Sequence, residues 1–186
     1  MPELYFLSSN KYKIQETQVI LAAVGITVRA FERKIDELQT TDVAKLVRDK
    51  ALQAFLAIGR PLFVEHTGLY LSYLNGFPGG LTQVFWDTIQ ADRFAELFGR
   101  SPDPHVTART TVCFVDGKRF YVYEGEARGR ITAEPRGSRD FQWDCVFLPD
   151  GLDKTYAELG PEKNRISMRV RALETFAAAF ASISHV

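Results

Sequence analysis

The chain has 186 residues, of which 46% are hydrophobic and 25% charged, as in an ordinary globular protein. Its 23 Lys and Arg residues balance its 23 Asp and Glu residues, so no long-range field attracts polyanions and a nucleic acid partner is not expected. No apolar stretch reaches membrane-spanning length and the N-terminus does not resemble a signal peptide, so we expect no membrane partner and a cytoplasmic location. The length favours one domain over residues 1–186, with two small domains as the alternative.

Strands and helices alternate through the first half of the chain. Runs of β-branched and aromatic residues such as "ITVRAFE" are typical of strands, and apolar residues at helical spacing indicate the helices between them. Asp42 is expected to cap one helix and Gly59 to end it. The expected elements are a strand over residues 3–9, a helix over 11–24, a strand over 26–32, a helix over 42–59, strands over 61–68 and 69–74, and a helix over 87–99.

The second half is rich in strands. Residues 107–131 contain Asp116-Gly117, the standard signal for a two-residue hairpin turn. A loop with Pro and Gly follows over residues 132–151, and a last helix begins near residue 167. Early alternation followed by hairpins predicts an α/β fold with a mixed sheet.

Polar residues occupy the first predicted strand-to-helix turn, "LSSNKYK". A helix N-terminus offers free N–H groups and a positive dipole end, which suit a phosphate group. Ser8, Asn10 and Lys13 could add donors around such a group. Alternatively, Asn10 only caps the helix and Lys13 is solvated; taken alone, this motif favours that interpretation.

An acid and an imidazole, Glu65 and His66, stand side by side directly before a Thr-Gly corner. Ligands of α/β sheets gather beyond the carboxyl ends of strands, where these residues are expected. Mg²⁺ prefers carboxylate oxygens, which Glu37 and Glu65 could supply, and His66 could act as a general base. The alternative is a carboxylate–imidazole pair that only orders the corner, and both interpretations remain open.

Two aromatic residues and several polar ones lie late in the chain, in "DFQWDCVF" and "EKNRISMR". Phe141 and Trp143 offer flat faces on which a purine could stack. Asp144, Lys163 and Arg169 could hydrogen-bond the edge of that base. The alternative is that the aromatic residues belong to the core, which is the usual case in a strand-rich region.

In this order, "SSNKYK", "EHTG" followed by "LNGFPG", "FQWDC" and "EKNRISMRVRAL" resemble the motifs of the inosine triphosphate pyrophosphatase family. The resemblance implies an elongated α/β fold with a long mixed sheet and a cleft between two lobes, a homodimer, and a Mg²⁺-dependent cut that releases nucleoside monophosphate and pyrophosphate. By position it assigns His66 and Glu65 to catalysis and Glu37 and Glu65 to the metal. The substrate-binding residues that it implies are Ser8, Asn10, Lys13, Thr67, Gly68, Phe141, Trp143, Asp144, Lys163, Met168 and Arg169.

Five positions depart from the family pattern, and all fall inside the implied site. His66 replaces an acid that is thought to activate the attacking water, and Met168 replaces a histidine that would face the purine 6-oxo group. Gln142 replaces a glycine, Cys145 replaces a proline, and Gln83 stands where relatives place a cation. Two alternatives therefore remain beside the family reaction: the same reaction on a different base, or nucleotide binding without hydrolysis.

Overall fold

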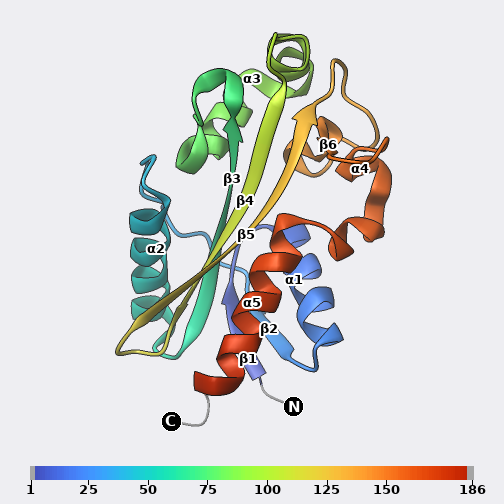
Figure 1. The fold of residues 1–186 in the computed structure, drawn as a ribbon. Helices are drawn as coiled ribbons and strands as arrows, with labels where there is room; N and C mark the ends of the chain where they lie inside the picture. The colour runs from blue at the N-terminus through green and yellow to red at the C-terminus, as the bar shows by residue number, and fades with distance from the viewer. Residues whose placement is uncertain (1–2, 184–186) are drawn as a thin grey trace.

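A six-stranded mixed sheet forms the centre of the protein in the computed structural model, which describes residues 3–183 (Figure 1). The strand order is β2-β1-β3-β4-β5-β6, with β1 parallel to β2 and β3 and all other neighbours antiparallel. The predicted mixed α/β sheet is thus confirmed. The strands are β1 (Glu3–Leu7), β2 (Thr27–Phe31), β3 (Leu62–Leu71), β4 (His105–Val115), β5 (Phe120–Ile131) and β6 (Phe147–Pro149).

Helices cover both faces of this sheet, with α2 on one side and α1 and α5 on the other (Figure 1). Among residues 3–183, no helix combines the length and the apolar character needed to cross a membrane. The α-helices are α1 (Lys11–Ala23), α2 (Val43–Ile58), α3 (Thr82–Phe94), α4 (Tyr156–Leu159) and α5 (Met168–Ile183). Shorter 3-10 turns cover Ser72–Leu74, Gly79–Leu81, Gln142–Cys145 and Gly160–Arg165, and a π-helical turn covers Ala95–Gly99.

Strand β3 extends past the end of β1 and exposes its two faces to different helices. Phe6 pairs with Phe63, so β1 ends shortly before Glu65. Successive side chains of a strand point to opposite faces. Phe63 packs in the core cluster with α1 and α5, and Val64 packs in the cluster with α2. Glu65 and His66 therefore point to opposite faces of the sheet.

Two predictions about the middle of the chain are wrong. Residues 61–74 form one strand, β3, followed by a 3-10 turn, and not two strands, so Glu65 and His66 lie within a strand and not at its end. Gly68 lies inside this strand, where the backbone at Gly79 packs closely against it. A Cβ on Gly68 would lie 2.5 Å from the Gly79 carbonyl oxygen, so only glycine fits there. Helix α3 begins at Thr82, earlier than predicted, and kinks at Gln90 (φ 64°).

Both ends of helix α2 are predicted more accurately than the hairpin. Asp42 caps α2 by accepting a hydrogen bond from the Lys45 N–H at 3.0 Å, and Gly59 ends the helix with φ 74°. The predicted two-residue turn between β4 and β5 is two residues too short, because Val115 pairs with Phe120 and residues 116–119 form the turn. Asp116 Oδ1 accepts hydrogen bonds from two N–H groups of that turn at 2.7 Å each, which favours the longer loop.

Helix α5 lies directly on β5 because position 125 is a glycine. A Cβ on Gly125 would come within 2.4 Å of the Met168 carbonyl oxygen and 2.3 Å of the Ala172 nitrogen. This close contact places the first turn of α5, which carries Arg169, deep in the protein, where Arg169 is 1% exposed. The fold thereby positions one of the predicted site residues.

Candidate active site

Asn10 and Lys13, at the start of α1, make different contacts. Asn10 caps α1, since its Oδ1 accepts a hydrogen bond from the Lys13 N–H at 3.1 Å, and its own N–H donates to Ser8 Oγ at 3.2 Å. The Lys13 side chain is not solvated: its Nζ lies 3.1 Å from Glu65 Oε1. Burial lowers the pKa of Lys13, and Glu65 acts in the opposite direction.

Arg169 holds the carboxylate of Glu65 with two hydrogen bonds. Its Nε donates to Glu65 Oε2 at 2.8 Å and its Nη2 donates to Oε1 at 3.1 Å. Its Nη1 donates to Glu16, a residue that the sequence analysis did not single out. Burial alone raises the pKa of Glu65, but Arg169 and Lys13 together hold it well below its usual range. Glu65 is therefore a buried anion whose two oxygens contact cations.

Glu37, and not Glu65, is the carboxylate that pairs with His66. Glu37 Oε2 lies 3.5 Å from His66 Nδ1, and Glu37 Oε1 accepts a hydrogen bond from Lys50 Nζ at 2.5 Å. Burial raises the pKa of Glu37, but His66 and Lys50 outweigh it and hold the pKa far below its usual range. Lys50, buried on α2, also donates to the Glu65 carbonyl oxygen at 3.0 Å, so it ties both segments together.

The surroundings of His66 favour its neutral form, and one of its ring nitrogens has no hydrogen-bond partner in the part of the chain that the structure describes. Burial lowers its pKa, Glu37 opposes this, and the charges of Lys13 and Lys50 lower it further. A carboxylate only accepts hydrogen bonds, so the Glu37 contact favours the tautomer with the proton on Nδ1. Nε2 then carries a lone pair, and this atom has no hydrogen-bond partner among the described residues. A buried polar atom without a partner is costly, which suggests that a ligand completes this site.

A second ionic group surrounds Lys163. Its Nζ lies 2.5 Å from Asp144 Oδ2 and 2.8 Å from Glu16 Oε1, and 4.3 Å from the ring centroid of Phe141. Burial raises the pKa of Asp144 to about 6, although Lys163 acts in the opposite direction. Glu16 links this group to Arg169 and hence to Glu65. The predicted base-recognition residues are thus connected to the predicted catalytic ones through one helix, α1.

The two predicted aromatic platforms differ in accessibility. Trp143 is 3% exposed and packs in the core, with ring centroids 5.6 Å from Phe147 and 6.5 Å from Tyr156. Phe141 is only partly buried and stacks on Tyr12. The alternative interpretation, in which aromatic residues here belong to the core, therefore describes Trp143, whereas Phe141 keeps an accessible position.

Gln142 reaches from the 3-10 turn Gln142–Cys145 to helix α3. Its Nε2 donates to Gln83 Oε1, and Gln83 Nε2 donates to both oxygens of Asp87 at 2.8 Å. The Asp87 carboxylate orients both amides, because it can only accept. Gln142 has φ 46°, a backbone conformation that glycine adopts without strain, which fits the glycine of the family pattern at this position.

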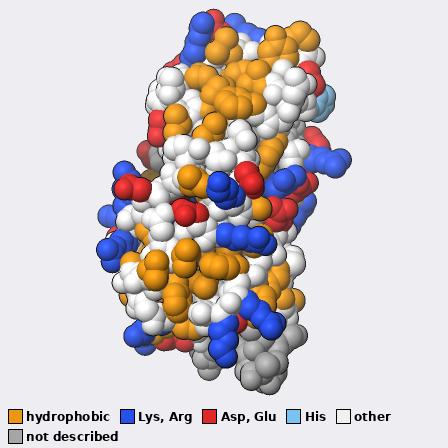
Figure 2. All heavy atoms as spheres, turned by 90° about the vertical axis from the view of Figure 1, so that its left-hand side faces the viewer, with side chains coloured by type: hydrophobic (Ala, Val, Ile, Leu, Met, Phe, Trp, Pro, Cys, Tyr) orange, Lys and Arg blue, Asp and Glu red, His pale blue; other side chains and the backbone are white. Residues whose placement is uncertain are grey.

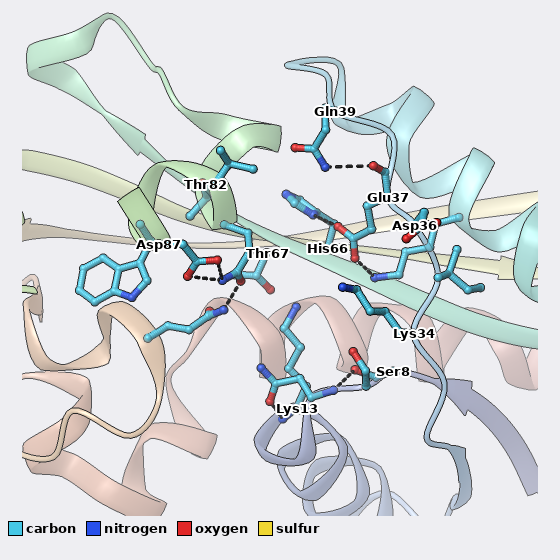
Figure 3. A pocket seen from close by; sticks show the side chains of 18 of the residues that line it. Ser8, Lys13, Lys34, Asp36, Glu37, Gln39, His66, Thr67, Thr82 and Asp87 are labelled. Atoms are coloured by element: carbon cyan, nitrogen blue, oxygen red, sulfur yellow. Dashed lines mark hydrogen bonds and ion pairs between the residues drawn. The ribbon is translucent and has the colours of Figure 1, made fainter. Parts of the chain in front are cut away.

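A cleft of about 480 Å³ brings most of these groups together. In Figure 3, Ser8 and Lys13 lie on one side of it, and Glu37 and His66 lie across from them. The predicted residues on its wall are Ser8, Asn10, Lys13, Glu37, His66, Thr67, Gln83, Gln142 and Trp143. Glu65, Gly68 and Met168 do not line it: Glu65 is covered by Arg169 and Lys13, Gly68 packs on Gly79, and Met168 is buried in the core.

Several further residues of this cleft wall belong to none of the motifs. Arg33, Lys34 and Asp36 come from the loop before α2, and Thr82 and Asp87 from α3. From the side of α2 and α3, charged side chains form a band across the middle of the surface between apolar areas (Figure 2). Arg33 and Lys34 add positive charge to a cleft whose inner ion pairs are balanced.

The donor set fits a metal only partly. Among the described residues, no group of three or more His, Cys, Asp or Glu side chains is arranged to hold a metal ion. Glu65 is buried in ion pairs, so the structure does not present it as a free ligand. Glu37 also contacts Lys50 and His66 through its two oxygens, but it is partly exposed and lines the cleft. One carboxylate together with substrate phosphates and water is a common way to bind Mg²⁺, and Glu37 fits this mode.

Comparison with known proteins gives consistent similarities along the whole chain. A family model described as the Ham1 family matches residues 4–179. The dITP/XTP pyrophosphatase of Methanopyrus kandleri is 36% identical over 177 residues, which covers 94% of both chains. The inosine triphosphate pyrophosphatase of Candida glabrata is 32% identical over 183 residues, covering 94% of this chain and 95% of that one. The solved structure of a HAM1 protein from Coxiella burnetii superimposes with a TM-score of 0.81 at 25% identity, over 98% of this chain and 100% of that one.

Proposed function

The chain belongs to the Ham1 family, and we propose that it hydrolyses non-standard purine nucleoside triphosphates to the nucleoside monophosphate and pyrophosphate. The family confirms the resemblance to inosine triphosphate pyrophosphatases that the motifs indicate. Relatives named dITP/XTP pyrophosphatase and inosine triphosphate pyrophosphatase support this reaction and these substrates. The protein is thus a nucleoside triphosphate pyrophosphohydrolase.

One structural observation carries the proposal: the N-terminus of α1 and the Glu37–His66 pair face each other across one cleft. The first N–H groups of a helix and its positive dipole end favour a phosphate. Ser8, Asn10 and Lys13 surround this end, and Arg33 and Lys34 add charge from the loop opposite. A triphosphate lying in the cleft would touch both walls.

His66 is the proposed proton acceptor. Water adds to the α-phosphorus, the bond from that phosphorus to the α–β bridging oxygen breaks, and pyrophosphate leaves. His66 Nε2, unprotonated and without a partner among the described residues, takes the proton of the water. Glu37 orients the ring and stabilises the imidazolium that forms. Glu65 acts by holding Lys13 and Arg169 in place.

The triphosphate is proposed to enter as its Mg²⁺ complex. Glu37 is the carboxylate that would face the ion from the cleft wall, while phosphate oxygens and water complete its shell. When bound, the ion supplies positive charge that stabilises the phosphate oxygens. Asp144 and Lys163 are proposed to read the polar edge of the base, next to the face of Phe141.

A panel of nucleotides tests the substrate class. We expect the purified protein with Mg²⁺ to form monophosphate from ITP, dITP and XTP with a kcat/KM at least tenfold above that for ATP, GTP and the pyrimidine triphosphates. Preference for one of the common bases would instead support the same reaction on a different nucleotide. Tight binding of ITP without turnover would show that hydrolysis has been lost.

Lys13→Met is expected to lower kcat/KM for ITP by about 10²-fold, the usual loss when one donor to the transition state is removed. Lys13 Nζ is partly buried next to Glu65 and lies at the end of the helix that the phosphates approach. Lys11→Met is the matched control, because Lys11 is exposed in the same turn and does not line the cleft. A Lys13→Met enzyme within threefold of wild type would remove Lys13 from the phosphate site.

Gln142→Gly is expected to raise kcat/KM for ITP by about threefold to tenfold. The change removes the amide bridge to Gln83 between two residues that line the cleft, and glycine adopts the φ of 46° without strain. Gln83→Ala should reproduce the gain, since it breaks the same bridge from the other side. Steady-state kinetics of both variants measures the effect, and a fall in kcat/KM for both would mean that the bridge helps to hold the substrate.

The assembly is proposed from the family resemblance, and the domain organisation and location are proposed from the sequence. We propose a homodimer of single-domain chains in the cytoplasm, without a nucleic acid or membrane partner. Light scattering on the purified protein tests the dimer and should give twice the mass of one chain at micromolar concentration. A mass equal to one chain throughout the range would reject it.

A further inference from the structure

Two aromatic rings from distant parts of the chain stack in a second, smaller pocket, and the chain neighbours of both rings line the cleft. The ring centroids of Tyr12 and Phe141 lie 5.1 Å apart, and the ring planes differ by 19°. Tyr12 belongs to the first turn of α1, and Phe141 directly precedes the 3-10 turn Gln142–Cys145. Tyr12 is 43% exposed, which is high for an aromatic side chain that already has a stacking partner.

This stack lies at the boundary of two hollows. Lys13 and Gln142, the chain neighbours of the two rings, line the large cleft. Both rings line a second pocket of about 190 Å³. That pocket also includes the ionic group formed by Glu16, Asp144 and Lys163. A ligand that extends from the phosphate turn towards this ionic group must therefore pass the two rings.

The chemistry of the second pocket suits a flat heterocycle. Aromatic side chains stack on nucleobases, and Asp144 and Lys163 offer hydrogen-bonding groups for the edge of such a ring. Trp143, predicted to flank the base together with Phe141, packs instead against Phe147 and Tyr156 in the core. The second exposed aromatic face beside Phe141 is that of Tyr12.

We propose that Tyr12 clamps the base of the nucleotide against Phe141 and so is a base-binding residue, with no part in binding the phosphates. This inference rests on the proposed function. Rings 5.1 Å apart leave no space for a third ring between them, so one ring moves when a base enters. Tyr12 is the one that moves, because it is exposed, whereas Phe141 is partly buried with Lys163 Nζ 4.3 Å from its centroid.

Equilibrium binding of two ligands separates the base from the phosphates. Inosine monophosphate carries the base, and inorganic tripolyphosphate with Mg²⁺ carries only the phosphate chain. In Tyr12→Ala we expect the Kd for inosine monophosphate to rise about tenfold or more, the usual effect of losing one stacking ring. The Kd for tripolyphosphate should stay within twofold of wild type. Tyr12→Phe keeps the ring and should restore wild-type binding of both ligands, and Lys11→Ala is the control for the helix turn.

The outcomes distinguish this inference from the proposed function. Wild-type protein that binds inosine monophosphate but hydrolyses no triphosphate overturns the proposed reaction, and the Tyr12 comparison still decides the clamp. An unchanged Kd for inosine monophosphate in Tyr12→Ala overturns the clamp, as does wild-type protein that does not bind this ligand. Equal weakening of both ligands in Tyr12→Ala also overturns it, because Tyr12 would then only support the helix turn.

Discussion

Arg169→Met is expected to lower the free energy of unfolding by about 3–5 kcal/mol, the usual cost of removing one partner from a buried ionic network. Arg169 is 1% exposed and donates to both oxygens of Glu65 and to Glu16. Without it, and counting the described residues alone, Glu65 keeps only Lys13 as a cationic partner and Glu16 keeps only Lys163. Glu65 then remains buried, and Glu16 partly buried, with less compensating charge, which is more costly than the loss of the arginine contacts themselves.

Chemical denaturation at constant pH and salt measures this change. Arg171→Met is the matched control, because Arg171 lies two residues further on the same helix, is exposed, and its side chain donates only to the Glu126 carbonyl oxygen among the described residues. The control should change the free energy of unfolding by less than about 1 kcal/mol. A loss below 1 kcal/mol in Arg169→Met as well would show that the network does not stabilise the fold.

His66→Ala is expected to reduce kcat for ITP by about 10²–10⁴-fold, the range typical of a lost general base, with KM changed less than threefold. The reason is local: Nδ1 contacts Glu37, so the lone pair is on Nε2, a buried atom of this cleft residue that has no partner among the described residues. The effect falls on kcat because the proton moves only in the chemical step.

His66→Asp distinguishes the base from a purely structural side chain. A carboxylate at this position also accepts a proton and matches the acid of the family pattern, so this variant should recover much of the activity that His66→Ala loses. Single-turnover kinetics with ITP compares the three proteins. Activity within threefold of wild type in His66→Ala would assign the proton transfer to another group.

Much of the site could be predicted because its residues stand in motifs whose order matches a family. Asn10 caps α1 as expected, and Ser8, Asn10 and Lys13 share the cleft with Glu37 and His66. The motifs do not specify how charges pair across the sheet. Sequence neighbours Glu65 and His66 point to opposite faces, so Glu65 meets Lys13 and Arg169 while His66 meets Glu37.

Two further residues could have been found from helical spacing. Glu16 lies three positions after Lys13, so both face the same side of α1, where Glu16 contacts Lys163 and Arg169. Lys50 interrupts the buried stripe of α2 between Val47 and Ala54, and a lysine at a buried position needs an acidic partner. For Trp143 the sequence left core burial and base stacking open, because the choice depends on its packing against Phe147 of β6 and Tyr156 of α4.

The bond that is cut in ITP tests the central claim most directly. With Mg²⁺ in the buffer, ³¹P NMR of the reaction identifies the phosphate product as it forms. A cleft that holds the α-phosphate next to His66 predicts inosine monophosphate and pyrophosphate in equal amounts, with no orthophosphate in the early phase. Orthophosphate together with inosine diphosphate would contradict the account, because it would mean that the γ-phosphate lies at the reacting position.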